Sequence, residues 1–441
     1  MNRFFLLLLL SFQFVVQGQI ITTFAGTGSN IYSGNGVAAT AAGIPDPCKG
    51  VFDNIGNYFF ADQLGSNRIR RVDISGQITT VAGCGIVGFT DNIQATDCDL
   101  NLPKSITLDA SGNLYIADAG NFRIRKVDKG TGIISTIAGT DSSAFSGDNG
   151  PASSASLNDP LDLCFDKYGN LYIADGFNYR VRKINKLGII STFAGNGGTV
   201  STGDGGPATS AQLGLPIGLV SDDIGNIYIA ETVGNRVRKV DTFGIITTIA
   251  GNGIATYLAD NIPATMAQIN PIRLAINFGQ IFIADEYNRR VYRIDLAGIL
   301  HLVAGNGMGG FSGDGGVATA TSLDYPAGVA FDTCGNLYIP EPSNRRIRKV
   351  SYPHCHYLRN ENHPNVNLSI YPNPSNDFIK IDNLEKTSNY RILNIVGSMM
   401  LHGILKEGNN IISLNTVPKG MYILEIISNE DEKRVIKIVK E

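Results

Sequence analysis

The sequence is poor in the residues that acid–base catalysis and nucleic-acid binding require. Its 441 residues include five His and no Trp, and 36 Lys and Arg stand against 39 Asp and Glu. The net charge of −3 gives no overall basic field that would attract nucleic acid. After residue 18, no segment is long and apolar enough to span a bilayer, which takes about 20 helical residues. We therefore expect neither a nucleic-acid partner nor stable membrane insertion.

Histidine is especially scarce where a catalytic site would have to lie. His301 is the one His between residues 19 and 352, and it falls on a predicted outer strand. A Ser-His-Asp triad or a His-based zinc site is therefore not expected, because each needs His in a concave site. Further along, His354 and His356 flank Cys355, where a metal site is the less favoured alternative to a disulfide. The sequence assigns no catalytic residue and no metal site.

The N-terminus has the pattern of a secretory signal. Arg3 precedes an unbroken apolar run over residues 4–10, and Val16-Gln17-Gly18 resembles a small-residue cleavage site. The run is too short for a membrane anchor. We predict a signal peptide over residues 1–18.

The six cysteines of an exported chain can form disulfides. Cys84 and Cys98 flank a single connection and form the first predicted pair. Cys334 and Cys355 fall at the same end of the last repeat and form the second. The remaining Cys48 and Cys164 have no obvious partner.

Residues 19–352 repeat one pattern six times. A tripeptide ending in Ala-Gly recurs at spacings of 57, 56, 56, 56 and 54 residues, and a Pro marks the start of each unit. Such a period is typical of repeat architectures. The Ala residues are Ala25, Ala82, Ala138, Ala194, Ala250 and Ala304, and the marker prolines are Pro47, Pro103, Pro160, Pro216, Pro271 and Pro326.

Each repeat holds four short strand candidates, which in the second repeat are residues 105–109, 113–118, 123–127 and 133–138. Strands joined by such tight turns form a meander, which can bury both faces only by stacking against neighbours. The last repeat stops after its third strand, and residues 20–25 match the missing fourth. Pairing the two would remove both exposed edges. The predicted fold class is all-β, a six-bladed β-propeller closed by the N-terminal strand; an open solenoid is the alternative.

Residues 114–128 and 312–319 carry the clearest family pattern. They read Leu-Tyr-Ile-Ala-Asp, then Asn-x-Arg-Ile-Arg-Lys-Val-Asp, and Ser-Gly-Asp-Gly-Gly-x-Ala-Thr. This pattern resembles the NHL-repeat family of β-propellers over about residues 20–351. The resemblance implies members that bind proteins, RNA or sugars, and a few that are enzymes. It therefore indicates a fold and leaves the function open.

The composition changes after a predicted linker at residues 353–365. Residues 366–441 contain Tyr371-Pro372-Asn373-Pro374 and, later, Gly420-Met421-Tyr422-Ile423 and a basic ending. They resemble the type A C-terminal sorting domain of the type IX secretion system, a small β-sandwich. The resemblance implies a Gram-negative protein that passes through the periplasm and across the outer membrane, with the secretion machinery as partner. A β-sandwich that stays packed on the propeller is the alternative.

An acidic residue ends the second strand of every repeat, and Arg residues such as Arg68, Arg123, Arg180 and Arg236 follow. The pattern favours acid–Arg pairs that lock neighbouring blades over a ligand site. We expect this structural acid ring to comprise Asp62, Asp118, Asp175, Glu231, Asp285 and Glu341.

A second set of acids lies in the Gly-Asp-Gly-Gly loops. Ca²⁺ needs about six or more oxygen ligands, and each loop offers one carboxylate, so turn capping is favoured over a Ca²⁺ site. Ca²⁺ is the one cofactor that the sequence leaves open. The loop acids are Asp91, Asp148, Asp204, Asp260 and Asp314.

One repeated position varies in a way that indicates function. Two residues after the marker Pro, two repeats have Gly218 and Gly328, whereas the others have Lys49, Ser105, Asp162 and Arg273. In a closed ring these side chains would surround the axis, so we predict a polar ligand site there; solvated channel lining is the alternative. The sequence thus favours a secreted or cell-surface module that binds a protein or glycan. A Ca²⁺-dependent lyase or hydrolase using carboxylates, and a structural surface or matrix component, are the alternatives.

Overall fold

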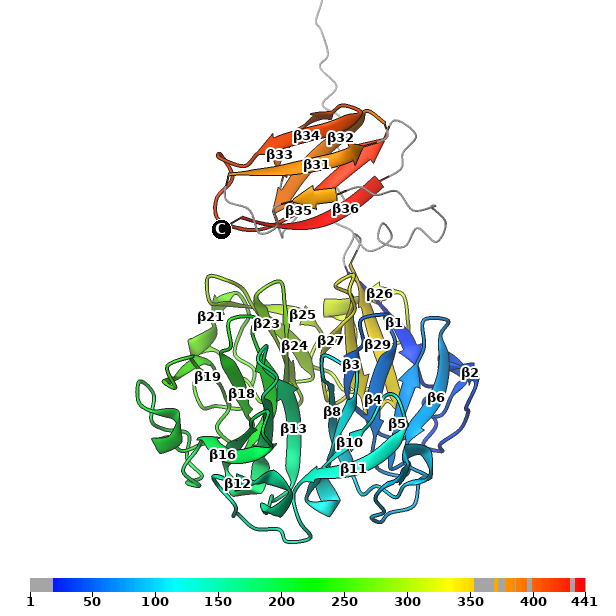
Figure 1. Cartoon of the computed structure of the whole chain (residues 1–441), viewed down its shortest axis with the longest axis vertical. Coiled ribbons are helices and arrows are strands. Elements are labelled where there is room, and N and C mark those ends of the chain that lie inside the picture. The colour runs from blue at the N-terminus through cyan, green and yellow to red at the C-terminus, as the bar shows by residue number, and fades with distance from the viewer. Residues whose placement is uncertain are drawn as a thin grey trace, which may run out of the picture.

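The structure is a computed structural model that describes residues 19–352, 369–371, 377–384, 386–394, 399–428 and 433–440. The predicted signal peptide, the linker at residues 353–365 and Cys355 lie outside these ranges. Within residues 19–352 the chain forms six antiparallel sheets of four or five strands (Figure 1). No helix of the described ranges is long and apolar enough to cross a membrane.

The first three sheets follow the chain from the innermost strand outward, and a short fifth strand from the preceding connection covers the outer edge. The first sheet has β3 (Pro47–Phe52), β4 (Tyr58–Asp62), β5 (Arg68–Val72), β6 (Gln77–Ala82) and β2 (Val37–Ala38). The second has β8 (Pro103–Leu108), β9 (Leu114–Asp118), β10 (Arg123–Val127), β11 (Ile133–Ala138) and β7 (Ile93–Gln94). The third has β13 (Pro160–Phe165), β14 (Leu171–Asp175), β15 (Arg180–Ile184), β16 (Ile189–Ala194) and β12 (Gly150–Pro151).

The other three sheets repeat this order, with the N-terminal strand inserted in the last. The fourth has β17 (Pro216–Ser221), β18 (Ile227–Glu231), β19 (Arg236–Val240) and β20 (Ile246–Ala250). The fifth has β22 (Pro271–Asn277), β23 (Gln280–Asp285), β24 (Arg290–Ile294), β25 (Ile299–Ala304) and β21 (Ile262–Pro263). The sixth has β27 (Ala330–Phe331), β28 (Leu337–Glu341), β29 (Arg346–Ser351), β1 (Ile20–Ala25) and β26 (Gly316–Val317).

Short 3-10 helices recur in the connections. One type precedes each innermost strand, and a second type joins the second and third strands of two sheets. The first type comprises η1 (Ala39–Ala41), η2 (Ala95–Asp97), η4 (Ala152–Ser154), η6 (Ala208–Ser210), η7 (Ala264–Met266) and η8 (Ala318–Ala320). The second comprises η3 (Ala119–Asn121) and η5 (Gly176–Asn178).

Alternating apolar residues place the core between neighbouring sheets. Ala61 and Ile69 of the first sheet share one buried cluster with Ile106 and Ile116 of the second. Side chains of a strand point alternately to its two faces, so each sheet contributes apolar residues to two such clusters. The sheets are therefore held by burial of apolar surface on both faces.

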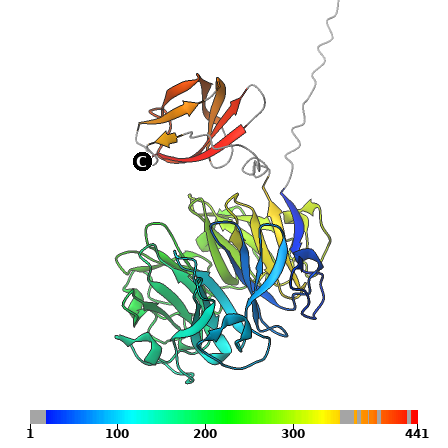
Figure 2. The ribbon, with the colours of Figure 1, turned by 45° about the vertical axis from the view of Figure 1, so that its right-hand side comes forward.

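The N-terminal strand pairs as predicted. β1 is hydrogen-bonded antiparallel to β29, with Ile20 opposite Ser351 and Thr23 opposite Arg348. Figure 2 shows the blue N-terminal strand lying against the yellow strand of residues 346–351. The innermost strands contact one another in the order β3, β8, β13, β17, β22 and β27, and β27 contacts β3.

The six ring acids are fully buried, and their partners correct one prediction. The Arg that pairs with the acid lies two residues beyond the one expected, as in Arg125 with Asp118 at 3.1 Å. The expected Arg123 instead donates to the Asn121 carbonyl and stacks over the Phe89 ring. The same pairing recurs in Arg182–Asp175, Arg238–Glu231 and Arg348–Glu341. Each pair joins two strands of one sheet, so these pairs do not lock neighbouring blades as predicted.

Four of the five loop acids also pair with these buried Arg residues, which differs from the turn capping predicted for them. Arg125 lies 3.1 Å from Asp91, so its guanidinium is held between two carboxylates. A buried Arg needs such partners, because desolvation of an unpaired charge is costly. The equivalent pairs are Arg182–Asp148, Arg238–Asp204 and Arg348–Asp314.

The predicted disulfide between Cys84 and Cys98 is wrong for this structure, in which both cysteines are free. The Cys84 amide donates to the Cys98 carbonyl at 2.8 Å, so the two residues are neighbours through their backbones. Their thiols diverge, because the Cys98 side chain is buried in the core and the Cys84 thiol donates to Asp99. Cys334, of the second predicted pair, is also a free thiol.

The C-terminal module consists of two sheets that share one apolar core, as a small β-sandwich does. Ile379 and Ile412 from one sheet and Ile392 and Leu424 from the other are buried together. One sheet has β30 (Ser369–Tyr371), β31 (Phe378–Leu384) and β34 (Gly408–Ser413). The other has β33 (Met399–Leu405), β32 (Ser388–Asn394), β35 (Gly420–Ser428) and β36 (Lys433–Lys440).

Two sheets depart from the acid–Arg pattern. In the first, Arg70 donates to the Gly34 carbonyl, and no ion pair joins it to Asp62 among the described residues. In the fifth, the Arg itself is missing. Tyr292 occupies the position that holds Arg in the other sheets, and Asp285 is bonded instead to the backbone and side chain of Asn288. Burial raises the pKa of Asp285 to about 6. A carboxyl whose pKa is higher folded than unfolded stabilises the fold at low pH, and that contribution is lost as the pH rises through 6.

We predict that Tyr292→Arg supplies the missing cation and lowers the pKa of Asp285. The substitution should therefore help stability more at pH 8, where Asp285 is ionised, than at pH 5. One pKa unit corresponds to about 1.4 kcal/mol, so the expected difference between the two pH values is about 1–2 kcal/mol. Urea unfolding at both pH values measures it. Tyr292→Phe is the control and should behave alike at both; an equal effect of Tyr292→Arg at pH 5 and pH 8 would contradict the prediction.

Candidate functional site

The four predicted ligand residues meet at the axis, where the structure buries them. Lys49 is 7% exposed, Arg273 is 2% exposed, and Ser105 and Asp162 are fully buried. They lie on β3, β22, β8 and β13, so four different sheets contribute to this axial cluster. In the fourth sheet the position is Gly218, where an added Cβ would come within 2.5 Å of the Ile272 carbonyl oxygen.

Asp162 is the centre of the axial cluster. Lys49 Nζ donates to its Oδ1 at 2.6 Å, and the Ser105 hydroxyl donates to the same oxygen. The backbone amide of Leu219 donates to Oδ2 at 2.8 Å. One carboxylate therefore accepts hydrogen bonds from the first, second and fourth sheets.

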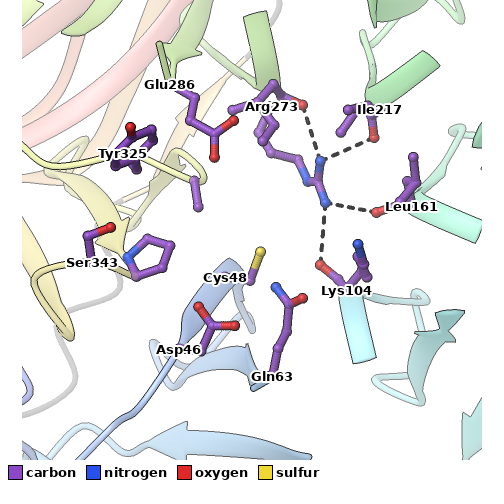
Figure 3. A pocket seen from close by; sticks show the side chains of 13 residues that line it. Asp46, Cys48, Gln63, Lys104, Leu161, Ile217, Arg273, Glu286, Tyr325 and Ser343 are labelled. Carbon is purple, nitrogen blue, oxygen red and sulfur yellow. Dashed lines mark hydrogen bonds between the residues drawn. The ribbon is translucent and has the colours of Figure 1, made fainter. Parts of the chain in front are cut away.

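Arg273 links the same strands through their carbonyl groups. Its guanidinium donates to Leu161 at 2.8 Å, to Ile272 at 3.2 Å, to Ile217 at 3.3 Å and to Lys104 at 3.4 Å, as Figure 3 shows. Its Nε lies 3.8 Å from Asp162 Oδ2. One cation thus spans the second, third, fourth and fifth sheets. Because the cluster residues bond to one another and to the backbone, they form a plug between the innermost strands.

An open cavity of about 380 Å³ lies at the end where the innermost strands begin. The residue directly after each marker Pro lines it, so all six repeats contribute to one mouth. Five of these residues are Cys or aliphatic and form an apolar floor, together with Arg273. The six are Cys48, Lys104, Leu161, Ile217, Ile272 and Ala327.

Polar side chains form the wall of this mouth cavity. Asp46, Gln63, Glu286, Tyr325 and Ser343 line it together with Lys104 (Figure 3). Asp46 Oδ2 accepts the Leu64 amide at 3.0 Å. Across the described residues, the side-chain polar atoms of the other wall residues have no hydrogen-bond partner. The mouth therefore offers donors and acceptors to a ligand, whereas those of the axial cluster are already paired within the protein.

Burial controls the ionisation of the two wall carboxyls. It raises the pKa of Asp46 and of Glu286, and nearby positive charge offsets part of the effect. Lys104 is one of these charges for both carboxyls, and Arg273 acts on Glu286. The wall groups are thus close enough to interact electrostatically across the mouth.

Exposed apolar residues follow the wall positions around the rim. They lie in the connections between the second and third strands, where each is the second residue after a ring acid. Leu64, Phe177, Val233 and Tyr287 are all more than half exposed. An exposed apolar rim around a polar cavity is typical of interaction sites.

The predicted residues, the second after each marker Pro, lie at the axis. The residues of the mouth, the first after each marker Pro, were not predicted. A register shift follows the marker Pro in five sheets, between Pro103 and Ser105 for example. This bulge turns the first residue after Pro toward the mouth and the second toward the axis. The residue after each ring acid, such as Gln63 or Glu286, varies between repeats and was the available signal.

The other chemical candidates remain structural. His301 is bonded to Asn261 and Asp295, each at 2.8 Å, on the outer strand β25. Among the described residues, no group of three or more His, Cys, Asp and Glu is placed to hold a metal ion.

Comparison with known proteins identifies both modules. Residues 369–441 match the family described as secretion system C-terminal sorting domain. The chain is 29% identical over 291 residues to SUPPRESSOR OF QUENCHING 1 of Arabidopsis thaliana, covering 62% of this chain and 27% of that protein. It is 28% identical over 299 residues to NHL repeat-containing protein 2 of Gallus gallus, covering 60% and 40%. The chain thus spans less than half of these relatives.

Solved structures show the same fold. An auxiliary nutrient binding protein from Bacteroides thetaiotaomicron aligns with a TM-score of 0.56 at 15% identity, covering 76% of each chain. A protein of unknown function from the same organism aligns with a TM-score of 0.55 at 19% identity, again over 76% of each chain. These likenesses are to the fold alone.

The first module is therefore an NHL-type β-propeller, and its strands form the blades. The chain joins this propeller to a C-terminal sorting domain of the type IX secretion system, which directs export to the cell surface or the extracellular space.

We predict that the floor and the wall of the mouth respond differently to substitution. Arg273→Met should lower the free energy of unfolding by about 3–5 kcal/mol, because four carbonyl groups and Asp162 lose a buried cationic partner. Lys104→Met, at the first position after the marker Pro of β8, should change the free energy of unfolding by less than about 0.5 kcal/mol. Chemical unfolding of both variants tests this, and a similar loss in both would contradict the division.

Proposed function

We propose that this chain is a secreted or cell-surface binding module, in which a closed ring of six blades holds a ligand at the mouth cavity. The observation that carries the proposal is the contrast between two adjacent polar groups. The axial side chains bond to one another and to the backbone, with Arg273 Nε as the one donor that lies at ion-pair distance only. In contrast, the wall side chains other than Asp46 have no hydrogen-bond partners among the described residues. The wall side chains are half-buried or exposed, so water solvates them in the free protein. A ligand whose polar groups replace this water can bind there.

The ring geometry supports the location. Contacts between innermost strands return from β27 to β3, and β1 completes the sixth sheet. The plug closes the floor, so a ligand can enter from the mouth and meet residues of all six repeats. The size of the cavity, about 380 Å³, falls within the ~300–1,000 Å³ of small-ligand sites.

The sorting domain supports the setting in which this binding would occur. A module placed outside the cell meets extracellular proteins and glycans, and the secretion machinery is its partner during export. We propose that residues 1–18 are removed as a signal peptide and that the sorting domain is removed after passage across the outer membrane.

The binding proposal is tested with a charge reversal at the wall. The full chain is screened against glycan and purified-protein panels, and the Kd of each ligand found is measured for Lys104→Glu. We expect at least tenfold weaker binding, because the substitution reverses a charge beside Asp46 and Glu286. Lys129→Glu, in an exposed turn of the same blade, is the matched control. Ligands that bind wild type, Lys104→Glu and Lys129→Glu equally would argue against the mouth as the site.

Removing residues 369–441 should block export. In a bacterium with a type IX system, the truncated chain is expected in the periplasm, since it keeps its N-terminal signal and loses the sorting domain. Cell fractionation with immunodetection measures this, and the unchanged full-length chain, expressed at the same level, is the control. Equal amounts of truncated and full chain outside the cell would contradict the assignment.

A further inference from the structure

The side chains that line the mouth cavity indicate which chemical class of ligand it would bind. This inference rests on the proposed function. Its charged lining residues are two acids, Asp46 and Glu286, and two bases, Lys104 and Arg273. Two carboxylates therefore face two cations, and Arg273 already binds carbonyl groups. A charge-balanced site gives no electrostatic advantage to a strongly charged ligand.

The surrounding charges keep this balance. Asp159 interacts with Lys104 and Arg273, and Arg345 interacts with Asp46. Burial raises the pKa of Asp159 as it does for the two wall carboxyls. Each acid near the mouth thus has a cation nearby, and each cation an acid.

The hydrogen-bonding groups of the wall form a mixed set. Glu286 accepts, Lys104 donates, and Gln63, Tyr325 and Ser343 can do both. Across the described residues these side chains have no hydrogen-bond partner. A hydroxyl group is the ligand group that both donates and accepts, so several hydroxyls would satisfy such a wall.

The floor has the opposite character. Leu161, Ile217, Ile272 and Ala327 present aliphatic surface, and the Tyr325 ring stands at the edge. A suitable ligand therefore has an apolar face for the floor and polar edges for the wall. A sugar ring has this shape, with C–H groups on its faces and hydroxyls around its edge.

We infer that the mouth binds a neutral, polyhydroxylated ligand, a sugar unit of an extracellular glycan. One ring lies on the aliphatic floor, and its hydroxyls bond to Glu286, Lys104 and Gln63. Because the mouth is open to solvent on one side, the rest of an oligosaccharide can extend over the exposed rim at Tyr287 and Phe177.

The test measures binding of the full chain to neutral oligosaccharides of glucose, galactose, mannose and xylose by calorimetry. Acidic oligosaccharides and basic peptides are measured in parallel. We expect at least one neutral oligosaccharide to bind, with Kd changing less than about twofold between 50 and 500 mM NaCl, because no net charge is screened. Glu286→Ala and Lys104→Met should each weaken it about tenfold or more. Asp223→Ala and Lys129→Met, in exposed turns, are the matched controls.

The outcomes separate this inference from the proposed function. If only acidic glycans or basic peptides bind, and Lys104→Met abolishes that binding, the inference of a neutral ligand is wrong and the mouth remains the binding site. Absence of binding to all neutral oligosaccharides at 10 mM would also overturn the inference. Neutral binding that is equal in mouth variants and controls would overturn both. Thermal unfolding of each variant confirms that it is folded.

Discussion

A carboxylate at the centre of a ring of strands has to be neutralised from several directions at once. Asp162 is fully buried, and desolvation of an isolated charge would cost several kcal/mol. Its partners come from different blades, since Lys49 belongs to the first, Ser105 to the second and Leu219 to the fourth. The site depends on this constraint, because the cluster fixes the inner strands and closes the floor beneath the cavity.

Two neighbouring positions of each repeat have different structural roles. The second residue after the marker Pro faces inward and builds the plug, whereas the first faces the mouth and forms the floor. Repetition thus lets six nearly identical units produce one asymmetric cavity, because each position varies independently. Lys104 is the one charged residue among the six that directly follow a marker Pro, and Gly218 leaves room for the neighbouring strand and Arg273.

Much of the fold could be predicted from the sequence, because its period, turn residues and orphan strand are local signals. The pairing of β1 with β29 and the convergence of Lys49, Ser105, Asp162 and Arg273 follow from that period. The one-residue bulge after Pro could not be predicted, since alternation alone does not reveal where a register shifts.

The choice of partners also escaped prediction. The spacing predicted that the first Arg after each ring acid would be its partner. The structure pairs the acid with the Arg two residues later, which lies on the same face of the strand. That Arg also reaches a second carboxylate, as Arg125 reaches Asp91 of the preceding loop. Cys84 and Cys98 are adjacent through their backbones, yet their thiols point to different surroundings. The first case depends on a loop carboxylate 34 residues away in the chain, and the second depends on side-chain direction. Neither can be read from the spacing of the repeats.

We expect Lys49 and Asp162 to act as one energetic unit across two blades that are separated by a third. A double-mutant cycle with Lys49→Met, Asp162→Asn and the double variant measures this by urea unfolding. A coupling free energy of about 2 kcal/mol or more between the two sites is expected. Additive effects within about 0.5 kcal/mol would contradict it, because independent sites add to that precision.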